Sequence, residues 1–513
     1  MAGRTEFEFR FHEPQMREQT RRPDDAAMRI LIMGDFSGQG NRGAGNPADL
    51  AERPIVAVDV DNFDDILFRF APRLYLPIDT ETDASVEVEF KQLDDFHPDR
   101  LYRELDVFAA LRETHRRLCD PTTFAETASG LRREAVQRAE PAATAEKGAV
   151  LEEDEDSMFE RLLGHAPVAS PETRVAAPVA RTDIQQFINR IVAPYIVPEP
   201  DPFQDQYVAS VDTAISAQMR SVLHHAAFQS LESSWRGMRW LIDNLETGES
   251  LQLYLLNVTK EELRADIESG QGDLSATGLY RLLIEQGVQT LGGTPWSVLV
   301  GHYTFAATAD DINLLAALGV IGSQTGAPFL AAADSNLLGC RTLAETPDAR
   351  EWTHRDADAE QRWHALRQSN AAPWIGLAVP RMLLRLPYGK NTDEVDDFEF
   401  EEMGPERTHE DYLWGSPALA CAMLIGGSFL DRGWNMELGD RLDIDDLPAH
   451  TYTDQGESKL QACAEATLTE GTAGAILERG IMPLMSYKNR NAVKLIRFQS
   501  VADPVQPLAG PWR

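Results

Sequence analysis

The chain has 513 residues, which is enough for several domains with separate hydrophobic cores. Acidic residues outnumber basic residues 82 to 48, and the resulting net charge of −34 repels nucleic acid phosphates and anionic membranes, so we expect no nucleic-acid partner. No apolar stretch approaches about 18 uncharged residues and the N-terminus has no apolar signal region, so we expect no membrane insertion and a cytoplasmic location.

Residues 1–27 form an N-terminal arm with one short amphipathic strand. Phe7, Phe9 and Phe11 alternate with charged residues, which is the period-2 pattern of a strand with one apolar face. Such a short strand is not stable alone. Two interpretations stay open: an edge strand of the adjacent domain, or an arm that adds itself to a sheet in a neighbouring subunit.

A glycine run follows the first predicted core strand. Gly38, Gly40 and Gly43 have the spacing G-x-G-x-x-G, which is typical of dinucleotide-binding turns when a helix follows directly. If the run is a dinucleotide site, the chain is a nucleotide-using enzyme. The other interpretation is a mobile glycine loop.

The residues after the glycine run favour the loop. A helix capped by Asn46 has to end at Arg53, because Pro54 stops it, and about two turns are too short for a crossover between parallel strands. Asp59 or Asp61 stands near the distance expected of a ribose-binding acid, so the enzyme remains an alternative.

Residues 28–133 predict a small α+β unit. Alternating or continuous apolar runs predict its strands, and apolar residues at helical spacing predict its helices. We expect strands over 29–33, 54–60 and 85–90, a helix over 62–74, and one further helix that starts near Pro98 and runs to 118.

Residues 134–181 predict a disordered, acidic linker rich in Ala and Pro. The segment has too few large apolar side chains to form a core, and its centre is the run of five acids Glu152–Asp156. We interpret the acidic run as solvated. The sequence "MFERLL" that follows it is a candidate for a short docking helix.

Residues 182–513 predict a larger α/β domain with a mixed sheet. Nearly continuous apolar runs of strand length alternate with helical stretches, which is typical of strands that are buried on both faces and paired in parallel. We expect helices over 184–197, 211–228, 231–245 and 309–323, and strands over 251–258, 296–305, 327–333 and 375–380.

No set of residues assembles into a catalytic or metal-binding pattern. His224 and His225 are adjacent and cannot share a helix face, and neither a nucleophile elbow nor a phosphate-binding lysine motif is present. Four scattered cysteines, without a C-x-x-C pair, predict buried thiols: Cys119, Cys340, Cys421 and Cys463. We therefore expect a protein that is not an enzyme and has no cofactor or metal.

Several long motifs of the C-terminal half resemble the large subunit of the type VI secretion contractile sheath, TssC or VipB. The resemblance covers most of residues 200–500. Its motifs are Phe228–Leu263, Ile375–Gly389, Tyr412–Met423 and Leu477–Val493.

The N-terminal unit is similar to the small sheath subunit, TssB or VipA, through Met33–Gly38, Val60–Leu67 and Glu89–Leu101. The chain therefore looks like a small and a large sheath subunit fused in order through the acidic linker. The resemblance marks the following structural residues: Asp35, Phe36, Trp235, Arg236, Pro380, Arg385, Pro387 and Tyr388.

The resemblance implies a structural role in a contractile injection machine. In that family, paired subunits stack as a helical sheath around an inner tube, and arms at the chain ends pair as strands between neighbours. It implies other sheath subunits, the inner tube protein, the baseplate and a cytoplasmic AAA+ recycling ATPase as partners. It matches Phe7, Phe9 and Phe11 with the exchanged arm, and it implies no active site.

Two departures from the family pattern suggest an accessory paralogue that joins, starts or ends a sheath. The usual C-terminal module of the large subunit is missing after residue 513, and the region that normally carries the helix read by the ATPase is here the linker. On this basis we expect the chain alone to remain a monomer or small oligomer. A subunit of a non-contractile assembly stays an alternative.

Overall fold

The computed structural model describes residues 22–77, 85–133, 192, 204–289, 293–352, 356–404, 407–454, 456–488 and 490–512. The predicted arm strand at Phe7–Phe11, the linker at 134–181 and nearly all of the helix expected at 184–197 lie outside the described residues.

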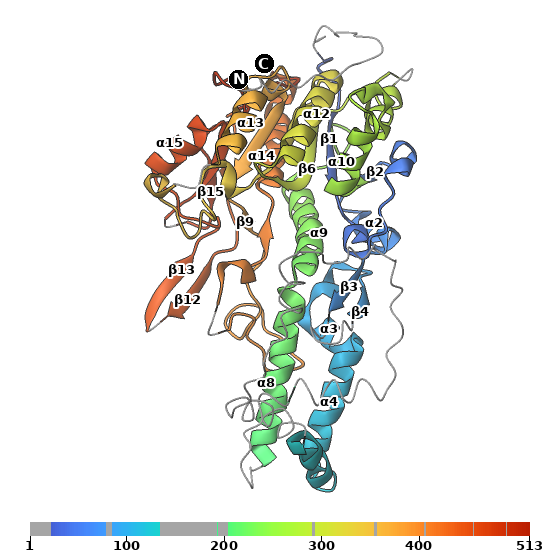
Figure 1. Ribbon diagram of the computed structural model, residues 1–513, viewed down its shortest axis with the longest axis vertical. Coiled ribbons are helices and arrows are strands. Elements are labelled where there is room, and N and C mark those ends of the chain that lie inside the picture. Colours follow the sequence, from blue (N-terminus) through green and yellow to red (C-terminus); the bar gives the residue numbers. More distant parts are fainter. Residues whose placement is uncertain are drawn as a thin grey trace, which may run out of the picture.

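A mixed sheet of nine strands forms the centre of a broad body, which occupies the upper half of Figure 1. The strand order is β11-β15-β14-β8-β7-β6-β1-β5-β2. All neighbours from β14 to β5 are parallel, whereas β2, β15 and β11 are antiparallel to the strands they join. The strands are β1 (Met28–Gly34), β2 (Val56–Val58), β5 (Leu251–Asn257), β6 (Val298–Phe305), β7 (Phe329–Ala333), β8 (Ile375–Val379), β11 (Asp443–Ile444), β14 (Ile481–Ser486) and β15 (Val493–Leu495).

Helices cover both faces of this sheet, which is why its central strands are apolar on both sides. In β1, Ile30 and Ile32 pack into the core cluster on one face, whereas Leu31 and Met33 pack into the cluster on the other. The first face is covered by α9 (Ala226–Asn244) and α14 (Pro417–Arg432), and the second by α10 (Lys260–Ser269) and α12 (Ala309–Thr325). The helix–strand alternation and the parallel pairs confirm the α/β class that the sequence predicts.

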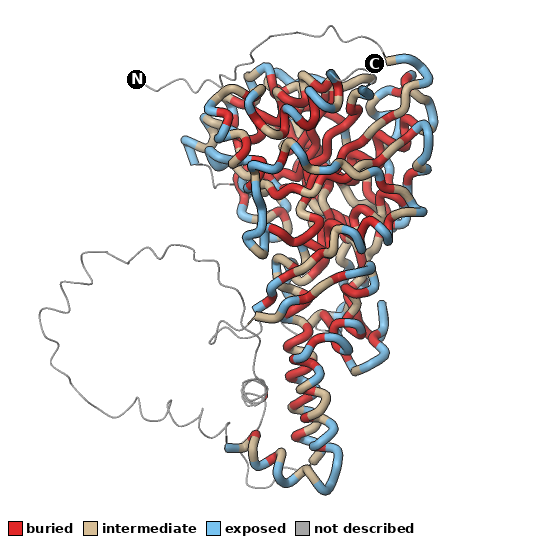
Figure 2. Tube along the Cα trace, turned by 90° about the vertical axis from the view of Figure 1, so that its right-hand side faces the viewer, coloured by how far each residue is buried: buried red, intermediate tan, exposed pale blue. Residues whose placement is uncertain are grey.

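Two helices extend from the body as a stalk, which Figures 1 and 2 show from two sides. The stalk consists of α4 (Asp106–Cys119) and α8 (Gln204–Leu223), which lie side by side. The side chain of Gln204 donates a hydrogen bond to the carbonyl of Leu118 at 2.6 Å, and His115 lies 3.3 Å from the carboxylate of Asp212. The buried positions of α8 face α4 and the remainder of the chain, and the outer positions are exposed.

Smaller elements join the stalk to the body, and a hairpin extends beside them. They are α2 (Phe63–Phe70), the antiparallel pair β3 (Arg73–Pro77) and β4 (Ser85–Glu89), η2 (Leu93–Phe96), α3 (Pro98–Glu104) and, on the other side, the hairpin of β12 (His450–Asp454) and β13 (Glu457–Gln461). The remaining helices of the body that Figure 1 labels are α13 (Ala357–Arg367) and α15 (Glu470–Glu478).

Three sequence predictions in these parts are wrong. The helix expected from Pro98 to 118 is two helices, because Leu105 has an extended backbone with φ −79° and ψ 130°. The helix expected over 62–74 ends at Phe70, where Ala71 has φ 45°, and β3 follows directly. Cys119 is exposed at the end of α4, whereas the other three cysteines are buried as expected.

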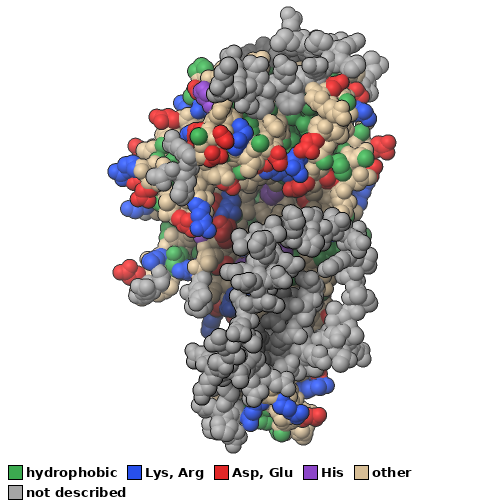
Figure 3. Space-filling model, in the orientation of Figure 1, with side chains coloured by type: hydrophobic (Ala, Val, Ile, Leu, Met, Phe, Trp, Pro, Cys, Tyr) green, Lys and Arg blue, Asp and Glu red, His purple; other side chains and the backbone are tan. Residues whose placement is uncertain are grey.

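The surface carries both signs of charge. On the face shown in Figure 3, acidic and basic side chains are interspersed over the body. Within the described ranges, no helix combines the length and the apolar character that crossing a bilayer requires.

Candidate functional site at the seam between the two segments

The N-terminal segment (22–133) and the C-terminal segment (204–512) meet along a buried contact that we call the seam. Its centre is β1, which pairs with β5 on one side and β6 on the other, so that Ile30 lies opposite both Leu253 and Val298. A strand paired on both sides has no free edge. The N-terminal segment therefore supplies an internal strand to a sheet whose other strands, except β2, come from the C-terminal segment.

Trp235 of α9 fixes the chain where it leaves β1. Its indole Nε1–H donates a hydrogen bond to the carbonyl of Phe36 at 2.9 Å, and the two rings meet edge to face with centroids 5.4 Å apart. The ring of Phe63 lies on Trp235 as well, at 5.7 Å. Both Phe36 and Trp235 are fully buried. Residues far apart in the sequence thus form one aromatic cluster across the seam.

The glycine run forms a tight turn around the carboxylate of Asp35. The backbone amides of Gln39 and Gly40 donate to the two Asp35 oxygens at 2.9 and 2.8 Å. Burial raises the pKa of Asp35, while hydrogen bonds from these amides oppose that shift. The amides that would have to hold a phosphate in a dinucleotide site therefore already bind a side chain of the protein itself.

The helices around this turn are short. α1 (Gln39–Arg42) is flanked by Gly38 at φ 72° and Gly43 at φ 61°, in the left-handed region that favours glycine. The helix predicted after Asn46 is the 3₁₀ helix η1 (Pro47–Glu52), which Asn46 caps. Its shortness confirms the prediction that no crossover helix follows the glycine run.

A buried ion-pair network lies beside the aromatic cluster. Arg385 donates from Nε to Glu232 at 2.9 Å and from both terminal nitrogens to Glu402 at 2.7 and 3.0 Å. Arg236 donates to Glu232 at 2.6 Å and to the hydroxyl of Tyr388 at 2.9 Å. Glu232 and Glu402 are 0% and 1% exposed, so their charges need these partners. We call Glu232, Arg236, Arg385, Tyr388 and Glu402 the Arg385 network.

The electrostatics of the Arg385 network follow from burial and from paired charges. Burial alone would raise the pKa of Glu402, but the Arg385 guanidinium and the amide of Tyr388 hold that pKa down at about 2. Burial raises the pKa of Tyr388 to about 12. At neutral pH Glu402 is therefore a carboxylate that faces the Arg385 guanidinium, and Tyr388 is a neutral phenol.

The structure brings most of the marked residues together, but not all of them. Phe36 and Trp235 form the aromatic end, Asp35 holds the glycine turn beside Phe36 in the chain, and Arg236, Arg385 and Tyr388 form the ionic end. Pro380 follows β8 with a cis peptide bond, and Pro387 precedes Tyr388 in the chain and accepts a hydrogen bond from Thr392 through its carbonyl. The arm residues Phe7, Phe9 and Phe11 lie outside the described residues.

Sequence reasoning missed three buried acids, of which one, Glu262, pairs across the seam. Glu232 stands four residues before Arg236 on the same helix, which is a detectable signal for an ion pair. Glu402 follows a stretch crowded with acids and has no such signal. Glu262 was missed as well: it is buried and accepts hydrogen bonds from Arg53 and from the side chain of Gln39, which join the segments again.

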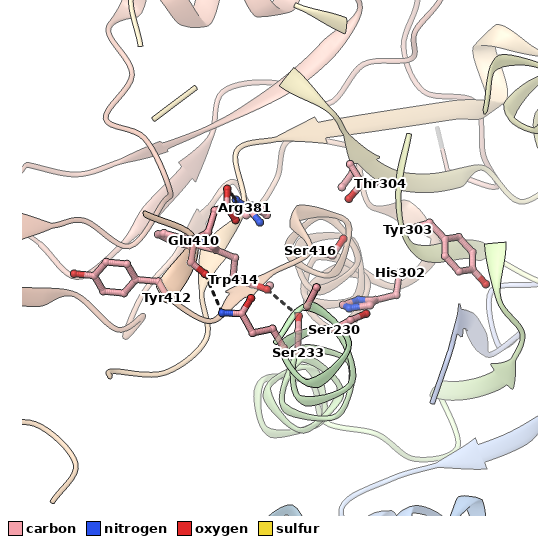
Figure 4. Close-up of a pocket in the computed structure, with 14 residues that line it drawn as sticks. Ser230, Ser233, His302, Tyr303, Thr304, Arg381, Glu410, Tyr412, Trp414 and Ser416 are labelled. Carbon is pink, nitrogen blue, oxygen red and sulfur yellow. Dashed lines mark hydrogen bonds and ion pairs between the residues drawn. The ribbon is translucent and has the colours of Figure 1, made fainter. Parts of the chain in front are cut away.

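A polar cavity of about 360 Å³ lies near the carboxyl ends of β6 and β7, between them and the start of α9 (Figure 4). Ser233 donates to the carbonyl of Trp414 at 2.8 Å, so part of the wall is internally bonded. His302 points toward the cavity, and burial lowers its pKa to about 4, which keeps it neutral at pH 7. Among the described lining residues, drawn in Figure 4, no nucleophile is hydrogen-bonded to a base that an acid in turn orients, as a catalytic triad requires.

His409, Glu410 and Glu465 lie close enough for a metal ion, with ligand atoms within 4.8 Å of one another. Arg381 already fills the space between them: its Nη2 donates to Glu465 at 2.8 Å and to Glu410 at 3.1 Å. His409 lies 2.7 Å from Glu465 as well. The geometry is that of an ion-pair cluster around Arg381 rather than of a cation site.

We expect NAD, FAD and ATP to leave the melting temperature of the protein unchanged, because Asp35 occupies the amides of Gln39 and Gly40. A ligand that binds only the folded state raises the melting temperature by mass action. The measurement is a thermal-shift titration with each nucleotide. A saturable shift that disappears in Gly40→Val contradicts this prediction.

We expect Glu402 to make stability depend on pH in the acidic range. Its folded-state pKa of about 2 lies below the ordinary 4.5, so its contribution is present above pH 4.5 and is lost as the pH falls toward 2. The measurement is urea denaturation of the wild type and Glu402→Gln at several pH values. The gap in unfolding free energy between the two proteins should shrink by up to about 3 kcal/mol as the pH falls. A gap that stays constant contradicts the prediction.

Two protein families match the two segments in the order of the chain. The family described as EvpB/VC_A0108, tail sheath N-terminal domain (VipB), matches residues 205–502. The family described as type VI secretion system, VipA, VC_A0107 or Hcp2, matches residues 13–140. The two matches leave residues 141–204 between them.

Two curated proteins of Pseudomonas aeruginosa strain PAO1 are similar to the chain. The type VI secretion system sheath protein TssC1 is 34% identical over 310 residues, which cover 59% of this chain and 62% of TssC1. The sheath protein TssB1 is 28% identical over 104 residues, which cover 20% of this chain and 60% of TssB1. The chain thus spans less than two thirds of the length of either relative. Since the tail sheath model covers more than half of the chain, the chain belongs to the VipB tail sheath family.

Proposed function

We propose that this protein is a structural sheath component of a type VI secretion machine, in which a TssB-like and a TssC-like segment act as one subunit. The observation that carries the proposal is the place of β1, a strand of the VipA-like segment that lies inside the sheet of the VipB-like segment. The Trp235 cluster and the pair of Glu262 with Arg53 support it, because both join the two segments into a single packed unit.

The proposed partners are other sheath subunits, the inner tube protein, the baseplate and a AAA+ recycling ATPase in the cytoplasm. The role is assembly by protein contacts and not catalysis. The use of the glycine-run amides by Asp35 supports this, because those amides are not open to a phosphate. The proposed partner contact of residues 1–27 is a strand that pairs with a neighbouring sheet.

The experiment is electron microscopy of the gold-labelled full chain, mixed with an ordinary TssB and TssC pair during sheath assembly. We expect label on the sheaths, either along them or at an end. A role as a sheath component is contradicted if the label stays in solution and the chain alone forms no tube.

We expect Phe9→Asp to weaken this association, because it places a charge on the apolar face of the arm at a cost of about 1–3 kcal/mol. The measurement is the fraction of chain that sediments with sheaths. The matched control is Glu8→Asp, which keeps the charge on the polar face of the same arm. Equal sedimentation of Phe9→Asp and the control contradicts the arm's proposed role.

A further inference from the structure

A second cavity, of about 400 Å³, lies across the seam at the end of the sheet where β1 begins. Arg29, Tyr254 and Trp296 form its polar and aromatic wall, and Ile55 and Leu282 form part of its apolar wall. None of its lining residues is acidic, although the chain contains 82 acidic residues. The electrostatic character of this cavity is therefore opposite to that of the protein as a whole.

Arg29 is held in this wall by two aromatic rings. Its guanidinium carbon lies 4.5 Å from the ring centre of Tyr254 and 4.2 Å from that of Trp296. Nη1 donates a hydrogen bond to the carbonyl of Thr294. Among the described residues, Nε and Nη2 have no hydrogen-bond partner and no carboxylate pairs with the group. Arg29 thus offers a fixed cation with free N–H donors.

The groups that neighbour Arg29 also favour the binding of an anion in this cavity. Arg22 also lacks a carboxylate partner among the described residues and donates to Ser297 and to backbone carbonyls. Burial and the nearby charge of Arg29 lower the pKa of Arg22 to about 10. The buried indole N–H of Trp296 has no acceptor in the described part of the chain. Arg53, in contrast, is neutralised by Glu262.

We propose that this cavity, the Arg29 site, binds the acidic run Glu152–Asp156 of a neighbouring copy of the chain. The run carries the densest negative charge of the linker and is flanked by the apolar residues Leu151 and Met158, which suit the apolar part of the wall. The inference rests on the proposed function, because it needs neighbouring copies at close range.

The dimensions of the molecule favour a neighbour over the same chain as the source of the run. The segment 124–133, teal in Figure 1, lies at the free end of the stalk, and α8 and α9 rise from there toward the level of the cavity. With 20 and 19 residues, these helices together span about 60 Å. The chain from Arg133 to Glu152 covers that distance only when almost fully extended, at about 3.3–3.6 Å per residue. The length of one chain sets no such limit on a run that comes from a neighbouring copy.

The experiment measures binding of a fluorescent peptide of residues 149–160 to the full chain by anisotropy. The receptor carries Gln or Asn at each of the five acids 152–156, so that its own run does not compete. We expect saturable binding that weakens as ionic strength rises. A peptide with the same five neutral replacements should bind about tenfold more weakly or worse.

Two receptor variants locate the peptide at the Arg29 site. Arg29→Gln removes the free donors, and Ile55→Glu adds a repelling charge to the wall while leaving Arg29 intact. Each should weaken binding by about tenfold or more. The matched control is Arg264→Gln, an exposed arginine paired with Asp310 outside this cavity. Melting curves of all receptors show which variants are folded.

Three results overturn the inference: equal binding of the acidic and neutral peptides, unchanged binding to a folded Arg29→Gln or Ile55→Glu, or equal loss in the control. Displacement of the peptide by inorganic phosphate at equal concentration indicates a small-anion site and overturns the assignment to the acidic run. Because the measurement uses dissolved protein and a peptide, its failure leaves the sheath-labelling experiment unaffected, and the two proposals can fail separately.

Discussion

Arg385→Met should lower the free energy of unfolding by about 3–5 kcal/mol, because it removes one side of a buried ion pair. Among the described residues, Glu402 would keep only the amide of Tyr388 and the ring of His224 as partners of its side chain, while it is 1% exposed. Glu232 would keep Arg236. The loss is therefore mainly the cost of a buried carboxylate without its cation.

The measurement is urea denaturation followed by tryptophan fluorescence, with the slope against urea compared between variants. The control is Arg264→Met, whose partner Asp310 is 62% exposed, so a loss of about 1 kcal/mol or less is expected there. Arg385→Lys should recover only part of the loss, since an ammonium group cannot bind two carboxylates in the same planar fork. If Arg385→Met is as stable as the control, the network has no structural role.

Cleavage of the linker should leave the two segments together. The seam contains β1 between β5 and β6, the Trp235 cluster and the contact of Glu262 with Arg53. None of these contacts involves a residue of the linker. A covalent tether between two units raises their effective concentration to about the millimolar range without adding contacts. We expect a chain cut at a protease site introduced near residue 148 to elute as one complex at micromolar concentration.

The same experiment with Trp235→Ala tests the seam itself. Truncating this fully buried ring costs about 3–5 kcal/mol and removes the hydrogen bond to Phe36, so the cut segments should separate at concentrations where the wild type does not. Phe68→Ala is the matched control, because Phe68 is 63% exposed on α2. Separation of the wild-type segments on cleavage contradicts a preserved seam.

The apolar patterns predict the elements of the body well, because strands buried on both faces must be apolar throughout. The run "LQLYLLNV" predicts β5, and the run "APFLAAA" predicts β7. The same signal is present in β1, but it does not show which sheet the strand joins. Its partners Leu253 and Val298 lie far along the chain, and nothing local encodes such a pairing.

The local breaks and the buried charges are harder to predict for physical reasons. The apolar stripe continues through Leu101 and Leu105 to Phe108, so the extended backbone of Leu105 leaves no trace in the pattern. Glu402 is buried because it lies next to Arg385 in the folded chain. Its neighbours in the sequence are exposed acids, so the sequence does not show which acid is buried. The resemblance identified Arg385, and the structure was needed to identify its partner.

The internal position of β1 has a consequence for how much of each segment a cell must make. When two halves of such a sheet are separate polypeptides, any excess of the larger one has a vacant slot between β5 and β6, with two rows of unpaired backbone groups open to aggregation. A single polypeptide produces both halves in equal number at every round of translation. Stoichiometry is thereby fixed by covalent connection, and matched expression of two genes is not needed to keep the slot filled.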